Sequence, residues 1–199
     1  MKKHILVDAD GVLLRWEEGF NSYMNTEGYI RLPYTETEYS IALRYGIPMS
    51  KAQIFMKEYN ESAAMRNLAP FADSVEYVSK LAALGFRFTV ITSLSDHPDA
   101  KTYRTENLHN LFGYIFDDVV CLEQGISKAS ILMRWADTRY FWIEDHMRQA
   151  LAGYEAGLRP ILINHPYNNH YTTDLFPIVE YDSPWKEIYK IICNDYGIA

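Results

Sequence analysis

The sequence predicts an α/β fold in which a Rossmann-like parallel sheet carries helices on both faces. Short apolar runs, typical of buried strands, alternate along the chain with stretches whose apolar residues recur at helical spacing. Single strands that alternate with single helices are typical of parallel sheets covered on both sides. The chain has 199 residues, of which 48% are hydrophobic, so it can bury one substantial core. We therefore expect one domain with an insertion.

The N-terminal part of the chain predicts the first strand and the insertion. Residues His4 to Val7 form a β-branched and aliphatic run typical of a buried strand, and Gly11 lets the backbone turn soon after it. Between residues 15 and 70 the pattern becomes helical and more polar. We interpret 15–70 as an inserted helical cap, of a size that suits a lid, and 1–14 with 71–199 as the sheet-containing core.

The rest of the core is predicted to alternate helices and strands. Gly85 is suited to end the first of these helices and Ser127 to begin the third. The predicted helices span 75–84, 102–111, 128–135, 146–156 and 183–194. The predicted strands span 86–91, 115–120, 140–143 and 159–163.

Composition excludes several classes of function. With 26 acidic and 19 basic side chains the formal net charge is -7, which gives no general attraction to a phosphate backbone, so we do not expect a duplex nucleic-acid binder. No apolar run approaches the ~18 residues that cross a bilayer, so we expect no membrane partner. The two cysteines lack CxxC spacing, and a cytoplasmic location is expected. The oligomeric state is left open.

Polar side chains follow three of the predicted strands, and the carboxyl ends of parallel strands meet at one edge of a sheet. Lys128 begins the helix before the fourth strand and is expected to reach the same edge. Carboxylates crowded there repel one another by several kcal/mol at low dielectric unless a cation lies among them, and oxygen ligands suit Mg²⁺. The polar residues at the strand ends are Asp8, Asp10, Thr92, Ser93, Glu144 and Asp145.

This set of side chains suits phosphoryl transfer. Hydroxyl groups at Thr92 and Ser93, with Lys128 and Mg²⁺, match the spread negative charge of a phosphoryl group. Asp8 is the expected nucleophile. Asp10 is placed to protonate the leaving alkoxide and then to deprotonate the attacking water.

Four segments of the chain resemble, in order, the four motifs of the haloacid dehalogenase superfamily of phosphatases: Asp8-Ala9-Asp10-Gly11-Val12, Val90-Ile91-Thr92-Ser93, Lys128, and Ile143-Glu144-Asp145. The resemblance covers roughly 1–14 and 71–165, and 15–70 is similar to a cap of the first class, which selects substrate. It implies an aspartyl-phosphate intermediate on Asp8, and Mg²⁺ bound by Asp8, Asp10 and Asp145. The sequence departs from the family at Glu144, where the family usually carries aspartate.

Within that superfamily the sequence is most similar to the 5'(3')-deoxyribonucleotidases. The first motif is followed by Trp16-Glu17-Glu18-Gly19-Phe20, and the second motif reads Thr92-Ser93, as in that group. The resemblance implies a 5'-nucleotidase for (deoxy)nucleoside monophosphates, in which Trp16 stacks on the nucleobase. Such stacking is worth ~1–3 kcal/mol for each base.

Three alternatives stay open at this stage. The first is a phosphatase of another small phosphate ester, such as a sugar phosphate or phosphoglycolate, in which Trp16 only packs the cap against the core. The second is a protein that binds phosphate or metal without catalysis, which the departure at Glu144 allows. The third is removal of a terminal 3'-phosphate from nucleic acid, which the net charge disfavours.

Overall fold

The structure, a computed structural model, describes residues 3–198, and the predicted α/β class is confirmed. Its six-stranded sheet has the order β3-β2-β1-β4-β5-β6, and every neighbouring pair is parallel. The sequence did not predict the last strand, because a run of three residues is too short to show a period. The strands are β1 (His4–Val7), β2 (Arg87–Ser93), β3 (Phe116–Leu122), β4 (Phe141–Glu144), β5 (Arg159–Asn164) and β6 (Ile178–Glu180).

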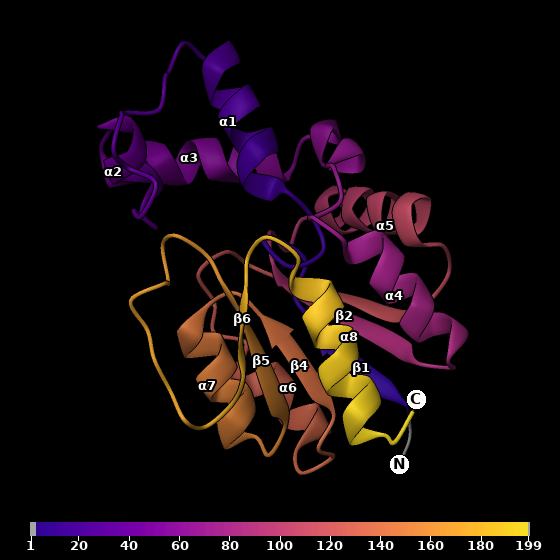
Figure 1. Cartoon of the computed structure of the whole chain (residues 1–199). Helices are drawn as coiled ribbons and strands as arrows, with labels where there is room; N and C mark the ends of the chain where they lie inside the picture. The colour runs from indigo at the N-terminus through magenta and orange to yellow at the C-terminus, as the bar shows by residue number, and fades with distance from the viewer. Residues whose placement is uncertain (1–2, 199) are drawn as a thin grey trace.

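Helices cover both faces of the sheet (Figure 1). Alternate side chains of β1 point to opposite faces, so Ile5 and Val7 join one buried cluster while Leu6 joins another. The first cluster includes residues of α4 and α8, and the second includes residues of α6. The core helices are α4 (Ser74–Ala83), α5 (Pro98–Phe112), α6 (Ala129–Leu132), η2 (Met133–Trp135), α7 (Met147–Glu155) and α8 (Pro184–Asp195).

Two of these helices differ from the prediction. Helix α5 begins at Pro98, earlier than the predicted residue 102, because His97 caps it by accepting a hydrogen bond from the Asp99 N–H and proline suits the first helical turn. The predicted helix 128–135 is a short α-helix followed by a 3₁₀ turn. Across residues 3–198, none of the helices combines the length and the apolar character that crossing a lipid bilayer requires.

The segment 15–70 forms a separate layer of helices beyond the carboxyl ends of the strands (Figure 1). The chain leaves and rejoins the core at adjacent points, since the Arg15 N–H donates to the Ala69 carbonyl at 2.9 Å and Leu14 bridges to Pro70. The elements of this layer are α1 (Trp16–Thr26), α2 (Ile41–Tyr45), α3 (Met49–Asn60) and η1 (Ala63–Asn67).

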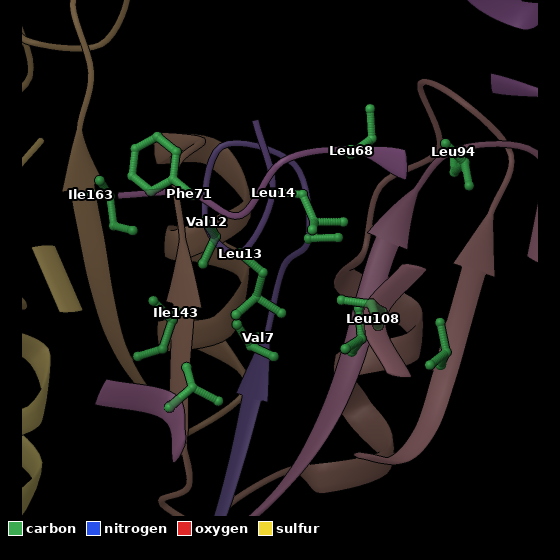
Figure 2. Packing of buried hydrophobic residues seen from close by; sticks show 14 of the residues in the cluster. Val7, Val12, Leu13, Leu14, Leu68, Phe71, Leu94, Leu108, Ile143 and Ile163 are labelled. Carbon is green, nitrogen blue, oxygen red and sulfur yellow. The ribbon is translucent and has the colours of Figure 1, made fainter. Parts of the chain in front are cut away.

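A continuous apolar cluster supports the loop after β1. Figure 2 shows Leu13 packed above Val7, at the end of β1, with Ile143 of β4 beside it. The same cluster includes Phe20 and Tyr59 of the helical layer. The loop that carries the two aspartates of the first motif is therefore packed from both sides, and interiors of this density allow little movement.

Candidate active site

The end of β1 is fixed against its two neighbours in the sheet. The register pairs Val7 with Val90 of β2, and the Asp8 N–H donates to the Ile143 carbonyl of β4 at 2.9 Å. Gly11 then turns the chain with a φ of +74°, and a Cβ atom there would lie 2.5 Å from Oδ2 of Asp145. Only glycine fits this turn without displacing that carboxylate.

Three buried carboxyl groups meet at this edge of the sheet. Oxygen atoms of Asp8, Glu144 and Asp145 lie within 4.8 Å of one another. Burial and then the charge of Glu144 raise the pKa of Asp8 to about 8. Burial also raises the pKa of Glu144 to about 7 and that of Asp145 to about 6. Such a group binds a hard divalent cation well, because the cation offsets both the repulsion and the lost hydration.

Lys128 lies within this group. Its buried ammonium is 2.8 Å from Oδ1 of Asp8 and 2.8 Å from Oε2 of Glu144. The other oxygen of Glu144 accepts the N–H groups of Asp145 and His146, at 3.2 and 3.1 Å. Glu144 therefore positions Lys128 and the start of the loop after β4. With three carboxyl groups against one ammonium, the group carries an excess of negative charge once all three acids are ionised.

Asp10 is not part of this group. Its two oxygens accept hydrogen bonds from Nη1 and Nη2 of Arg104, at 2.6 and 2.9 Å. The resemblance implied Asp10 as a metal ligand. In the structure its side chain binds a guanidinium on α5, while oxygens of Asp8, Glu144 and Asp145 lie together. Arg104 was not foreseen, because sequence alone does not show which residue of a polar helix faces the sheet edge.

The two hydroxyl residues of the second motif occupy the end of β2. Thr92 is buried, and within residues 3–198 its Oγ1 has no hydrogen-bond partner. Ser93 is half-buried and its hydroxyl makes a long bond, 3.4 Å, to the Ile126 carbonyl. Buried polar atoms are nearly always satisfied. An unpartnered hydroxyl one strand away from Asp8 therefore fits the oxygen of a bound ligand.

Trp16 packs inside the helical layer. Its ring stacks on Phe20 with centroids 4.7 Å apart and planes 9° apart, and it meets the edge of Tyr59 at 5.9 Å. Its indole N–H donates to Oδ1 of Asn60 at 2.8 Å. One face and the indole N–H of Trp16 are thus used in packing within the helical layer.

The loop after β5 supplies contacts that the sequence analysis did not predict. The Tyr167 hydroxyl donates to Oδ2 of Asp145, and the His165 ring stacks on Tyr167 with centroids 4.8 Å apart. Nε2 of His165 lies 2.8 Å from the Gly11 carbonyl, and burial lowers the pKa of His165 to about 4. His165 is therefore neutral near pH 7 and acts by packing and hydrogen bonding.

The helical layer also reaches this loop. Tyr39 packs edge-on against Tyr167 and against His146, with centroids 5.4 and 5.2 Å apart. The guanidinium of Arg44 lies 5.9 Å from the centre of the Tyr167 ring. His146, which precedes α7 (Met147–Glu155), is half-buried under Tyr39.

Comparison with known sequences gives one distant relative. No family model matches the sequence. An uncharacterised 32.4 kDa protein from the Gp30-rIII intergenic region of Enterobacteria phage T4 is 28% identical over 151 residues, which is 67% of this chain. The chain spans about half the length of that protein.

Solved structures share the architecture over nearly the whole chain. A predicted phosphatase from Clostridium acetobutylicum matches with a TM-score of 0.68 and 15% identity, covering 98% of this chain and 99% of that one. A haloacid dehalogenase-like family hydrolase from Streptococcus pneumoniae matches with a TM-score of 0.64 and 16% identity, covering 95% of this chain and 98% of that one. A predicted phosphoglycolate phosphatase from Haemophilus somnus matches with a TM-score of 0.65 and 13% identity, covering 96% of this chain and 97% of that one. The chain has a haloacid dehalogenase-like fold.

Proposed function

We propose that this chain is a Mg²⁺-dependent phosphatase that hydrolyses a small phosphomonoester through a phosphorylated Asp8. The observation that carries the proposal is the arrangement around Asp8. A buried lysine and two more buried carboxyl groups surround this side chain, and on the next strand lies a threonine hydroxyl without a hydrogen-bond partner among residues 3–198. A phosphoryl group, with its cation, supplies the charge and the hydrogen bonds that this arrangement lacks.

Asp8 and Asp145 are the residues that would hold the metal ion. Oδ1 of Asp8 accepts the Ala9 N–H and pairs with Lys128, so Oδ2 is the atom left for attack. Asp145 is oriented by the Tyr167 hydroxyl, and Glu144 keeps Lys128 in place. When bound, Mg²⁺ would neutralise the phosphate and allow one anion to approach another.

The reaction divides between the two aspartates. Asp8 attacks phosphorus as the bond to the ester oxygen breaks, and Asp10 donates a proton to that departing oxygen. Asp10 then takes a proton from water, whose oxygen attacks phosphorus and frees both inorganic phosphate and the carboxylate of Asp8. Thr92, Ser93 and Lys128 hold the phosphoryl oxygens through both steps. The cap 15–70 limits the access of water during the first step.

For the leaving group, the structure favours a small ester without a base. One face of the Trp16 indole, which a nucleotidase would use for stacking, lies against Phe20, and its N–H donates to Asn60. One of the proteins with a similar fold is a predicted phosphoglycolate phosphatase, which supports the same class of substrate, a small ester without a base. The 5'-nucleotidase is the second candidate, and Tyr39 supports it, since this residue is 61% exposed beside Tyr167 and an exposed aromatic ring suits stacking on a base.

A panel of phosphate esters, assayed with and without Mg²⁺, tests the proposal. The panel includes sugar phosphates, phosphoglycolate, the nucleoside monophosphates and 4-nitrophenyl phosphate. We expect hydrolysis only with the metal, and faster turnover of esters that lack a base. Faster turnover of the nucleotides selects the second candidate, and no hydrolysis of any ester contradicts both.

A further inference from the structure

The most unusual side chain outside the expected motifs is Arg104, on α5. It is fully buried, with 0% exposure, yet it is a charged residue in the middle of a helix. Both terminal nitrogens bond to Asp10, at 2.6 and 2.9 Å. A buried guanidinium without a partner is strongly destabilising, so this position depends on the carboxylate that it meets.

The contact fixes Asp10 in one orientation. A guanidinium that binds both oxygens of a carboxylate sets the plane of that carboxylate as well as its position. The backbone is held too, because Asp10 bridges to Leu14 and the Gly11 N–H donates to the Leu14 carbonyl at 2.9 Å. The side chain and the backbone of Asp10 are thus both held in one conformation.

A purely structural link between α5 and its surroundings is already provided by another residue. Nδ2 of Asn107, one turn further along α5, donates to the carbonyls of Arg66 and Leu68 at 3.0 and 3.1 Å. Nε of Arg104, in contrast, is buried and has no hydrogen-bond partner within residues 3–198. Arg104 therefore gives its hydrogen bonds to Asp10 and leaves a donor unused, which is uncommon for a residue that only stabilises a fold.

We propose that Arg104 is a positioning residue that orients Asp10 for proton transfer to the leaving group. The inference rests on the proposed function, in which Asp10 is the acid and then the base. The guanidinium holds both oxygens of Asp10, so the carboxyl group keeps one orientation while the ester bond breaks.

The leaving group provides the test. An alkoxide needs a proton as it departs, whereas 4-nitrophenolate departs without one, so a defect in Asp10 slows an alkyl ester far more. Release of the leaving group is measured in a single turnover, with enzyme in excess and Mg²⁺ present, for 4-nitrophenyl phosphate and for the best alkyl phosphate of the panel. Arg104→Met is expected to slow the alkyl ester about 10- to 100-fold and the aryl ester less than about threefold.

Three further variants separate positioning from folding. Arg104→Lys keeps the positive charge but lacks the two nitrogens that bind both oxygens of Asp10, so it should recover part of the rate with the alkyl ester. If Arg104→Met does not fold, Arg104→Lys is compared with the wild type in its place. In an Asp10→Asn background, Arg104→Met should cause no further loss, because its effect passes through Asp10. Arg87→Met is the matched control, since Arg87 pairs with Asp117 at the opposite edge of the sheet. It should leave both rates unchanged.

Three results overturn the positioning role while leaving the proposed function intact. The first is an equal loss with both esters in Arg104→Met, and the second is a loss that adds to that of Asp10→Asn. The third is an Arg104→Met protein that turns over both esters like the wild type. If the wild-type protein hydrolyses neither ester, the proposed function itself fails and the role of Arg104 fails with it.

Discussion

Two aspartates of one short loop lie in opposite electrostatic surroundings. Asp8 shares a buried site with two other acids and one lysine. Asp10 faces a guanidinium that binds both of its oxygens. The difference fits the proposed roles, in which a cation and a phosphoryl group bind beside Asp8 while Arg104 orients Asp10.

The largest expected effect comes from replacing Asp8, the proposed nucleophile. Asp8→Asn should abolish turnover, a loss of about three orders of magnitude or more, because an amide oxygen does not form the phosphorylated intermediate. The fold should persist, and the melting temperature should not fall, since a buried carboxyl with a raised pKa is replaced by a neutral group. Steady-state kinetics and thermal melts measure both. Asp182→Asn, an exposed aspartate, is the control.

Hydrolysis by Asp8→Asn at a rate near that of the wild type would show that another group attacks phosphorus. Asp8 would then have a structural role, and the proposed division of roles between Asp8 and Asp10 would be wrong.

The second prediction concerns pH and the metal. Without a divalent cation, the raised pKa values of Asp8, Glu144 and Asp145, about 8, 7 and 6, mean that the folded protein binds protons more tightly than the unfolded chain. This contribution to stability is present below about pH 4 and is lost as the pH rises through 6 to 8. Mg²⁺ should restore it, so the rise in melting temperature that Mg²⁺ causes should be larger at pH 8 than at pH 5.

Thermal melts over this range, with Mg²⁺ or with a chelator, measure the effect, and chelation should also stop turnover. Asp145→Asn should weaken the Mg²⁺ response, whereas Asp182→Asn should keep it. A response to Mg²⁺ that is equal at all pH values, or absent, contradicts a metal site made of these acids.

The third prediction addresses the lysine that joins the two neighbouring acids. Lys128→Met leaves Asp8 and Glu144 without their cation and removes a contact to the phosphoryl group. We expect kcat/KM to fall about 100-fold and the melting temperature above pH 7 to fall as well. Lys101→Met, at an exposed lysine of α5, is the control for loss of a positive charge. A Lys128→Met protein with wild-type kinetics contradicts the phosphate-binding role.

The smallest effect is expected in the cap. Trp16→Phe keeps an aromatic ring against Phe20 but removes the indole N–H that Asn60 accepts, at a cost of about 1 kcal/mol in stability. Activity toward base-free esters should stay within about twofold. Denaturant unfolding and substrate-panel kinetics measure the two. A rise in KM that is confined to nucleotides would instead show that Trp16 contacts a base. The KM values of Tyr39→Ala for the same substrates test the other aromatic ring proposed to stack on a base.

Much of the sheet edge could be predicted from sequence, because it follows from local patterns. A strand buried on both faces is a short apolar run, and its polar end is visible at Asp8, at Thr92 and at Asp145. Parallel pairing then brings distant segments together at one edge, as it does in the structure.

The partners of these residues could not be predicted in the same way. Arg104 lies in a helical stretch rich in polar residues, and which of its side chains are buried depends on how α5 packs on the sheet. The contact of Tyr167 with Asp145 depends on the path of a loop after β5. The glutamate at position 144, where aspartate was expected, allowed the alternative of a protein without catalysis. In the structure its longer side chain bonds Lys128 and two backbone N–H groups.

The most direct test of the central claim is to detect the phosphoryl group on Asp8. The Asp10→Asn variant, which lacks the base for the second step, is mixed with 4-nitrophenyl phosphate and Mg²⁺, quenched in acid, digested and examined by mass spectrometry. We predict phosphate on the peptide that contains Asp8, dependent on Mg²⁺ and absent from the Asp8→Asn/Asp10→Asn double variant. Release of 4-nitrophenol in a burst without any phosphate on that peptide would contradict the account.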